Sequence, residues 1–356
     1  MRRKRISICD EFKCIGAACP ANCCQGWKIP LDYDTYMKYL NAKGYFGKKL
    51  RYFTKRGEET AAFRSAFARC PFWGSDHLCE IQKKHGIEYM PAVCVQFPRQ
   101  LYNLGFFCEE TLYLACPEAV KLFLQYLDKD GPFDYVIMEG EVSYKVNTTN
   151  DDESFLNYLV NARDDLTAML RTGMGFDSMA ILDYGRDAQN ACIRGNKLPS
   201  PLNYMSLERY QINVEMMDKL LFHGFYHPNL WVMSPVLYKL CKKYIRHFHI
   251  FRRMNIRAAE QKRVLLQQDL SLKFPEIERL LNRYYEYYLL TNFLDIYEDY
   301  SFSKCLLFGI AKTRVLQLFL ALFSEDRDRL EMAEIAKIIA IYERRAPHIK
   351  DALPRL

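Results

Sequence analysis

The chain has 356 residues, of which 50% are hydrophobic and 26% are charged, and its formal net charge is +7. This composition excludes an intrinsically disordered chain, and the length allows two domains with a sizeable core. Ten of the 13 cysteines lie between Cys9 and Cys116, a density that would indicate a disulfide scaffold in a short secreted chain.

The N-terminal segment is basic and lacks the marks of a secretory signal. Residues 1–56 contain 13 Lys or Arg and 4 Asp or Glu. Such a surface can attract nucleic acid, an acidic protein or an anionic cofactor, or it can be a solvated surface around negatively charged thiolates. No apolar run or small-residue cleavage site follows Met1. We therefore expect a cytoplasmic protein, in which clustered cysteines hold metal more often than they form disulfides.

Residues 1–130 predict an irregular, cysteine-rich metal or iron–sulfur domain. Asp32 and Asp34 can cap a helix that extends through Leu40, and residues 58–68 predict a second helix. The fold class that we expect is mainly α, with a small β-hairpin in this first domain.

The hairpin is predicted over residues 99–107 and 111–114, and it would return Cys116 towards the other cysteines. A helix should begin at Pro117, where the missing N–H costs nothing, and should end near Leu127.

A linker at residues 131–152 separates the first domain from a second one at residues 153–356. The linker predicts two short strands, at 135–138 and 142–146. From residue 153 onward apolar residues recur with helical spacing, so the second domain should be an all-α bundle. Its most apolar stretch, residues 306–323, contains Lys, Arg and Gln, and this predicts a buried core helix and no membrane span.

Eight cysteines have spacings that suit metal ligation, because short loops can bring two sulfurs to one ion. Four thiolates suit either tetrahedral zinc or a cubane iron–sulfur cluster. The neighbours Cys23 and Cys24 should point in different directions, so that one binds metal while the other packs or serves a second site. The eight are Cys14, Cys19, Cys23, Cys24, Cys70, Cys79, Cys94 and Cys116.

The remaining cysteines, among them Cys9 and Cys108, are expected to be buried thiols. The C-x3-C-x2-C spacing of radical enzymes, a phosphate-binding loop and a serine nucleophile elbow do not occur in the sequence. The Gly-Met-Gly at 173–175 follows a predicted helix, which does not favour a Rossmann fold.

The cysteine-rich segments resemble the flagellin lysine-N-methylases. The similar stretches are FKCIGAAC at 12–19, NCCQGWKI at 22–29, CPF at 70–72, FPR at 97–99 and CPE at 116–118, and the tyrosine-rich 284–289 is similar too. The resemblance implies methyl transfer from S-adenosylmethionine to surface lysines of flagellin, with an iron–sulfur cluster, most simply 4Fe-4S, on the family cysteines. It matches all eight cysteines, of which Cys14, Cys19, Cys23 and Cys94 are the preferred ligand set.

The acceptor site is predicted on the helix that carries Tyr284, Glu286 and Tyr288. Tyrosine faces attract a cationic amine, and hydroxyls or a carboxylate can orient it once it has lost a proton. The same pattern also fits a partly buried aromatic stripe. Arg99 is the candidate contact for the donor carboxylate or the cluster, and a surface or helix-end role is equally open.

Trp27 is the second candidate cofactor contact, as part of an apolar shell around a cluster or as ordinary core. A looser resemblance, to small zinc- or iron-chelating proteins, leaves a second function open. In that alternative the chain is a non-enzymatic metal-binding module whose basic N-terminus docks an acidic partner or nucleic acid.

Overall fold

A computed structural model describes most of the chain, and the strands of the described residues all lie before residue 138. The described residues are 2–57, 60–64, 69–127, 129, 131–138, 148–174, 176–195, 220–221, 225, 234–249 and 256–347. The first elements in chain order are β1 (Arg2–Ile6), α1 (Ile8–Glu11), β2 (Pro30–Leu31), α2 (Tyr33–Asn41), α3 (Gly44–Phe53), β3 (Thr54–Arg56), β4 (Ala61–Phe63), α4 (Glu80–His85), α5 (Ala92–Gln96), β5 (Arg99–Asn103), β6 (Phe107–Leu112), α6 (Pro117–Leu124) and β7 (Tyr135–Ile137).

From residue 153 onward, the regular elements of the described residues are helices. They are α7 (Glu153–Met169), α8 (Ser178–Arg194), α11 (Pro235–Tyr244), α13 (Ile256–Lys273), α14 (Ile277–Asn292), α15 (Ile296–Asp299), α16 (Phe302–Ser324) and α17 (Met332–Glu343). The fold is therefore mainly α with a small β part, as predicted.

The centre of the helical part is α16. Helices α8, α13, α14, α11 and α17 all contact it. Its length and apolarity would allow it to cross a membrane, but 83% of its most apolar 18-residue window is buried inside the molecule. This burial confirms the prediction of a core helix for residues 306–323.

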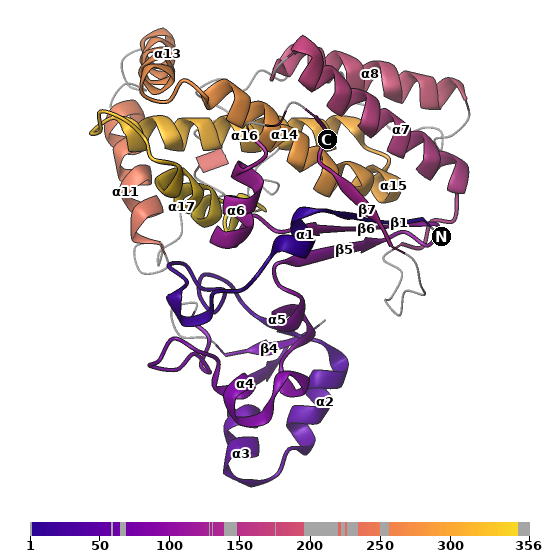
Figure 1. Ribbon diagram of the computed structural model, residues 1–356, viewed down its shortest axis with the longest axis vertical. Coiled ribbons are helices and arrows are strands. Elements are labelled where there is room, and N and C mark those ends of the chain that lie inside the picture. The colour runs from indigo at the N-terminus through magenta and orange to yellow at the C-terminus, as the bar shows by residue number, and fades with distance from the viewer. Residues whose placement is uncertain are drawn as a thin grey trace.

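A four-stranded sheet packs under the helices (Figure 1), in the order β5-β6-β1-β7. Strands β5 and β6 form the predicted antiparallel hairpin, and β1 joins β6 in parallel. Strand β7 pairs with β1, whereas the predicted partner strand at 142–146 lies outside the described residues. One apolar core extends from Ile6 through this sheet to the C-terminal helices.

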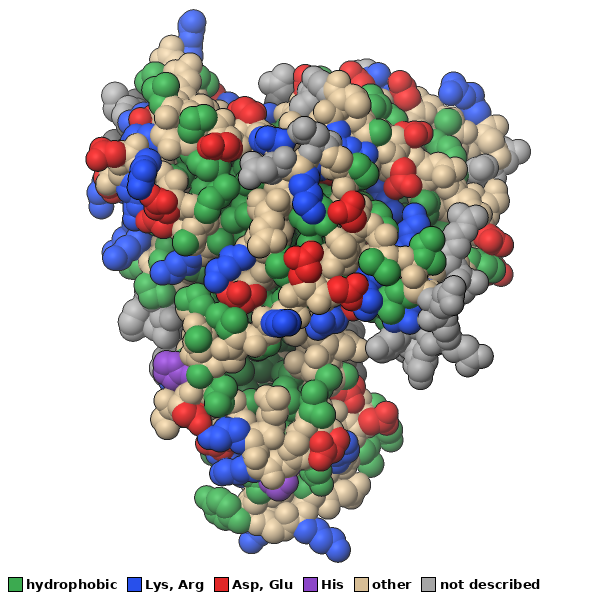
Figure 2. All heavy atoms as spheres, viewed as in Figure 1, with side chains coloured by type: hydrophobic (Ala, Val, Ile, Leu, Met, Phe, Trp, Pro, Cys, Tyr) green, Lys and Arg blue, Asp and Glu red, His purple; other side chains and the backbone are tan. Residues whose placement is uncertain are grey.

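The segment from residue 24 to 96, which we call the small lobe, projects below the rest of the molecule (Figure 1). It contains α2 to α5 and a sheet in the order β2-β4-β3. Its own core has nine buried side chains. Figure 2 shows that the molecule narrows between this lobe and the helical part, with hydrophobic side chains at the junction.

The prediction of a helix over residues 58–68 is wrong for residues 60–64, the part of this range that the structure describes. Residues 61–63 form β4, which pairs with β2 on one side and β3 on the other. All three of its side chains are buried in the small lobe, so pairing and burial outweigh the helical preference of its two alanines.

The capping prediction for α2 is confirmed. Asp32 is the N-cap, and its side chain accepts the Thr35 N–H at 2.9 Å. The predicted helix start at Pro117 is also confirmed, with Pro117 in the first turn of α6. The domain boundary proposed at 131–152 stays a prediction.

Candidate functional site

The eight predicted ligand cysteines all lie in described segments. The thirteen cysteines all lie in described segments, and none of them forms a disulfide with another. Within the described ranges, no three His, Cys, Asp or Glu side chains are arranged as ligands of a single metal ion. A metal centre is therefore a proposal, and the positions of the thiols have to be considered group by group.

Cys24, Cys70, Cys79 and Cys94 pack against the small-lobe core. The Cys70 N–H donates to the Cys24 carbonyl at 2.8 Å, next to a bridge between Gln25 and Arg69. A second bridge joins Trp73 to Cys79. Backbone pairing thus brings together Cys24 and Cys70, which are 46 residues apart in the sequence.

Burial lowers the pKa of Arg344, and the nearby charges of Cys19, Cys23 and Cys116 raise it, so these three cysteines lie near Arg344. Cys14 lies close enough to Cys116 to raise the pKa of the Cys116 thiol. Arg344, directly after α17, donates from Nε to the Ala115 carbonyl at 3.3 Å and from Nη2 to the Ala21 carbonyl. The Arg344 guanidinium therefore connects the loop that carries Cys19 and Cys23 to the residue before Cys116.

Burial disfavours the charged form of these thiols. Burial is the main cause that raises the pKa of Cys116 to about 11, with the charges of Cys19 and Cys14 adding to it. For Cys24, a hydrogen bond with Cys23 lowers the pKa, but a hydrogen bond with Cys70 and burial raise it further, to about 12. A bound thiophilic cation would replace the protons of these thiols, because a metal binds the deprotonated form. The thiols therefore suit metal ligation by their donor chemistry.

A cavity of about 340 Å³ lies beside the cysteines, in the size range of small-molecule sites. Cys23, Trp27, Arg99 and Arg344 are among its lining residues. The Trp27 indole N–H donates to the Cys23 carbonyl at 2.7 Å, so the Trp27 ring is fixed at the cavity wall. We call this space the donor cavity, because the two residues predicted from the sequence as cofactor contacts, Trp27 and Arg99, line it.

Arg99 lies at the start of β5, and its guanidinium already contacts two groups of the chain. Its Nη2 donates to the Cys9 carbonyl at 3.2 Å, and its Nε is 3.4 Å from a Glu110 carboxylate oxygen. Both residues predicted as cofactor contacts, Trp27 and Arg99, therefore border the same cavity, and Arg99 does so with its orientation set by Glu110.

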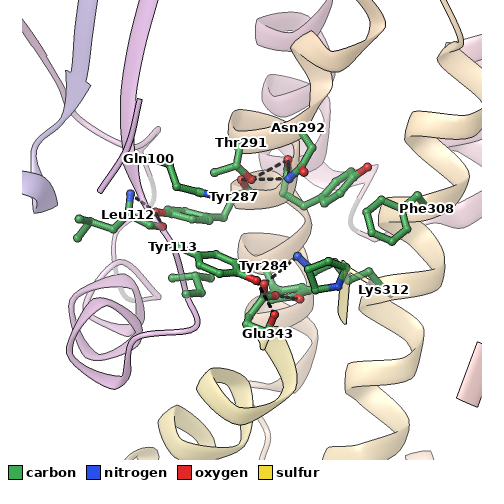
Figure 3. Close-up of a pocket in the computed structure, with 13 residues that line it drawn as sticks. Gln100, Leu112, Tyr113, Tyr284, Tyr287, Thr291, Asn292, Phe308, Lys312 and Glu343 are labelled. Carbon is green, nitrogen blue, oxygen red and sulfur yellow. Dashed lines mark hydrogen bonds and ion pairs between the residues drawn. The ribbon is translucent and has the colours of Figure 1, made fainter. Parts of the chain in front are cut away.

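A second cavity, of about 230 Å³, is walled by tyrosines and is shown in Figure 3. Tyr284, Tyr287 and Tyr288 of α14 line it together with Tyr113. Gln100, Tyr113 and Pro347 line both this space and the donor cavity, so the two are neighbours. We call the second space the tyrosine cavity.

One carboxylate, Glu343 at the end of α17, organises the tyrosine cavity. Its two carboxylate oxygens accept the Tyr284 hydroxyl and, at 2.9 Å, the Lys312 ammonium. Its carbonyl accepts the Tyr113 hydroxyl at 2.7 Å. In Figure 3, Tyr113 and Tyr284 converge on Glu343 from separate segments.

The Lys312 ammonium is the cation of the tyrosine cavity. Its Nζ lies 5.7 Å from the ring centroids of both Tyr284 and Tyr288. The Tyr288 hydroxyl donates to the Cys305 carbonyl at 2.7 Å. Two predicted acceptor-site residues, Tyr284 and Tyr288, are thus brought together around a buried amine of the chain itself.

Glu286, the third predicted acceptor-site residue, lies elsewhere. Its carboxylate is 2.5 Å from Arg171 and 2.8 Å from Arg283, and all three line a separate cavity of about 90 Å³. Sequence reasoning missed Glu343 and Lys312. The only signal for Lys312 was that it interrupts the apolar stretch of α16.

Similarity to known proteins points to flagellar proteins and lysine methylation. Over 121 residues, 32% of this chain, the sequence is 33% identical to the flagellar biosynthetic protein FliU of Salmonella muenchen, and the match covers 72% of FliU. It is 33% identical over 121 residues to the lysine-N-methylases of Salmonella typhimurium and Salmonella choleraesuis, of which it covers 30%. No family model and no solved structure matches the chain.

Proposed function

The chain belongs to the flagellin lysine-N-methylase family, and from this premise we propose that it is a cytoplasmic protein lysine N-methyltransferase. The proposed reaction transfers methyl groups from S-adenosylmethionine to surface lysines of flagellin. The observation that carries the proposal is the pair of neighbouring cavities, one lined by tyrosines, Glu343 and Lys312 and the other by Trp27, Arg99 and Cys23.

The tyrosine cavity suits a lysine side chain as methyl acceptor. A free lysine amine has a pKa of about 10.4, so at neutral pH it lacks the lone pair that must attack the methyl carbon. The faces of Tyr284 and Tyr288 can attract the incoming cation, as they already flank the Lys312 ammonium. Each such contact contributes roughly 0.5 to 2 kcal/mol, depending on desolvation.

Lys312 disfavours the protonated form of a second amine in the same cavity. Its ammonium is buried and paired with Glu343, so a second ammonium entering the cavity meets a like charge. Like charges and desolvation both lower the pKa of an amine. We therefore propose that Lys312 favours the neutral form of the acceptor lysine, which gives its proton to water before the methyl transfer, and that Glu343 keeps Lys312 and Tyr284 in place.

The donor cavity suits the methyl donor. S-adenosylmethionine supplies a methyl group on a sulfonium, and the lysine nitrogen bonds to that carbon as the carbon–sulfur bond breaks. The Trp27 ring offers an aromatic face for the sulfonium, and the Arg99 fork suits the donor carboxylate. Gln100 and Tyr113, which border both cavities, would lie between donor and acceptor.

We also propose that the cysteines hold an iron–sulfur cluster, as the family resemblance implies. The thiols of these cysteines fit such a group by their donor chemistry. When bound, a cluster would supply a compact anionic centre next to the donor cavity, where Cys23 forms part of the wall and Arg344 offers a compensating positive charge.

The test is to incubate anaerobically purified protein with flagellin and S-adenosylmethionine, and to measure the masses of flagellin peptides. We expect increments of about 14 Da per methyl on lysine-containing peptides, which disappear when the donor is omitted. A protein that carries its full metal content and adds no methyl group would contradict the proposal. That result would favour the non-enzymatic metal-binding module.

A further inference from the structure

Two arginines share one buried carboxylate on a side of α14 that does not line the tyrosine cavity. The Glu286 side chain is 2% exposed, and its carboxylate lies 2.5 Å from Arg171 and 2.8 Å from Arg283. One carboxylate oxygen accepts a hydrogen bond from each arginine. Two positive charges therefore face one negative charge in a part of the molecule that is largely removed from water.

The cavity of about 90 Å³ beside these three side chains has a third arginine in its wall. Arg279 and the residues three, four and seven positions after it, Asn282, Arg283 and Glu286, lie on one face of α14 and line this cavity. Asn282 adds an amide group, whose nitrogen can donate two hydrogen bonds. One helix face thus supplies most of the polar groups of the cavity, and Arg171 adds to them from another segment.

The lining carries an excess of positive charge. Lys129 also borders the cavity, but its ammonium lies 3.8 Å from the centroid of the Tyr126 ring, and that contact holds its charge. Among the lining residues that the structure describes, the three arginines and the single glutamate give a formal charge of +2. A concave site with this charge attracts anions.

Arg171 has donors to spare at this cavity. It belongs to the π-helix Leu170–Met174 that follows α7, and π-helical turns are rare and frequently occur at functional sites. Its side chain is 20% exposed, and its Nη1 donates to Glu286. Within the described ranges this is the one hydrogen bond of its guanidinium, so Nε and Nη2 can still donate to a ligand.

Arg283 makes the opposite wall rigid. Its Nη1 donates to Glu286 at 2.8 Å, and its Nη2 donates to the Gly131 carbonyl at 2.8 Å and to the Lys129 carbonyl. These bonds fix the guanidinium and attach the segment before β7 to α14. The positive charge of Arg283 is therefore held in place before any ligand enters, which is the preorganisation that favours binding.

We propose that this cavity binds a small dianionic oxyanion, a phosphate or sulfate group. Its volume equals that of about three water molecules at about 30 Å³ each, which suits one tetrahedral group and excludes a nucleotide. Guanidinium N–H groups match the oxygens of such a group, and a dianion balances the formal charge of +2 on the lining. The site is separate from the proposed methyl transfer and is tested without it.

The alternative is a structural network of Arg171, Glu286 and Arg283 that no ligand enters. The variant Glu286→Gln separates the two interpretations, because it removes the one negative charge of the described lining. An oxyanion should then bind more tightly and take over the role of countercharge. A structural network would lose stability in this variant, and added phosphate would not restore it.

Inorganic phosphate is the first probe. The whole wild-type chain is titrated by calorimetry at mildly alkaline pH, where phosphate is a dianion, with sodium chloride holding the ionic strength constant. Sulfate, acetate and glycerol phosphate are titrated in the same way. We expect one saturable site for phosphate and sulfate, and binding of acetate that is about tenfold weaker or more, because acetate offers one charge and two oxygens.

Three variants complete the test. Arg171→Met should weaken phosphate binding about tenfold or more, because it removes charge-assisted hydrogen bonds. Glu286→Gln should tighten it about fivefold or more, and phosphate should raise the Tm of this variant by more than it raises the Tm of the wild type. Arg329→Gln is the matched control, since this arginine is 81% exposed and pairs with Glu331 away from the cavity lining, and its phosphate affinity should equal that of the wild type.

Phosphate that binds no better than chloride would overturn the inference. So would acetate that binds as tightly as phosphate, or an Arg171→Met protein that keeps the wild-type affinity. If Glu286→Gln fails to fold, Arg171→Met still decides, because Glu286 keeps Arg283 as its partner there. Glycerol phosphate that binds like phosphate would assign the site to a phosphate group on a small molecule, whereas binding of phosphate alone would assign it to the free ion, and both results support the site.

Discussion

At the scale of single residues, Glu343 is the side chain on which the tyrosine cavity depends. It holds the Tyr284 hydroxyl and the Lys312 ammonium, and it is buried. We predict that Glu343→Gln lowers the methylation rate by about 100-fold or more, as the loss of a preorganised charged group does in other enzymes. The rate is measured from flagellin peptide masses over time.

The control for this prediction is Glu334→Gln on the same helix. Glu334 completes the capping box at the start of α17, and glutamine serves this position as well as glutamate does, so its methylation rate should stay near that of the wild type. Glu343→Gln also leaves the Lys312 charge unpaired, which costs roughly 3–5 kcal/mol of stability. The double variant Glu343→Gln, Lys312→Met should recover stability but not methylation, and recovered methylation would show that Glu343 has only a structural role.

The carboxylate of the tyrosine cavity shows what a sequence pattern can and cannot predict. The spacing of Tyr284 and Tyr288 placed both on one face of a helix, and the structure confirms that they share a cavity. The same helix suggested Glu286, which instead pairs with two arginines on another side. Glu343 lies 59 residues after Tyr284, on a different helix. No local sequence pattern indicates which distant helix end will contact the tyrosines.

At the scale of elements, Asp32 joins α2 to α5. Its carboxylate caps α2 through the Thr35 N–H and also accepts the Ala92 N–H, each at 2.9 Å. The second bond orients the first turn of the short helix that carries Cys94. We predict that Asp32→Ala destabilises the small lobe by about 1–3 kcal/mol, measured by urea unfolding, with Asp34→Ala as the exposed control. An unchanged midpoint would contradict the prediction.

The contribution of Asp32 should depend on pH. Burial raises the pKa of the Asp32 carboxyl, but the hydrogen bonds from the N–H groups of Ala92 and Thr35 lower it by a larger amount. The pKa therefore lies below its ordinary value. A carboxyl whose pKa is lowered by folding stabilises the folded state above its unfolded pKa of about 3.9, and this contribution disappears as the pH falls through the folded value. The difference in stability between wild type and Asp32→Ala should therefore shrink below about pH 4. An undiminished difference at pH 2 to 3 would contradict this.

Short elements were harder to predict than long ones. The long C-terminal helices have enough periodic apolar residues to be identified from the sequence, as α16 was. Strand β4 has three residues and exists because β2 and β3 lie on either side of it. Such a strand is determined by pairing with distant segments, which a local pattern does not contain.

At the scale of the whole molecule, Arg344 links the helical part to the cysteine loop. It contacts the carbonyls of Ala115 and Ala21, and it lines the donor cavity together with Ala115. We predict that Arg344→Ala speeds hydrogen exchange in residues 19–24 and 113–116 and weakens donor binding about tenfold, measured by exchange mass spectrometry and calorimetry. Arg329→Ala, which removes an arginine that is 81% exposed, should change neither. Unaltered exchange in Arg344→Ala would show that the loop is held by other contacts.

The packing of the N-terminal strand also belongs to this scale. Residues of β1 and β6 share an apolar core with the C-terminal helices. The parallel pairing of β1 with β6 joins residues more than 100 positions apart. Strand β5 pairs with β6 in the same sheet, and its first two residues, Arg99 and Gln100, line the donor cavity. Their positions therefore depend on contacts that only the folded chain makes.

The central claim is that the two neighbouring cavities form one methyl-transfer site. The most direct measurement is a crystal structure of the anaerobically purified protein with S-adenosylhomocysteine, the demethylated donor. We predict that this product lies in the cavity bordered by Trp27, Arg99 and Cys23. Its sulfur should face Gln100 and Tyr113 at the boundary with the tyrosine cavity. Density for the product at any other place on the chain, with this cavity empty, would contradict it.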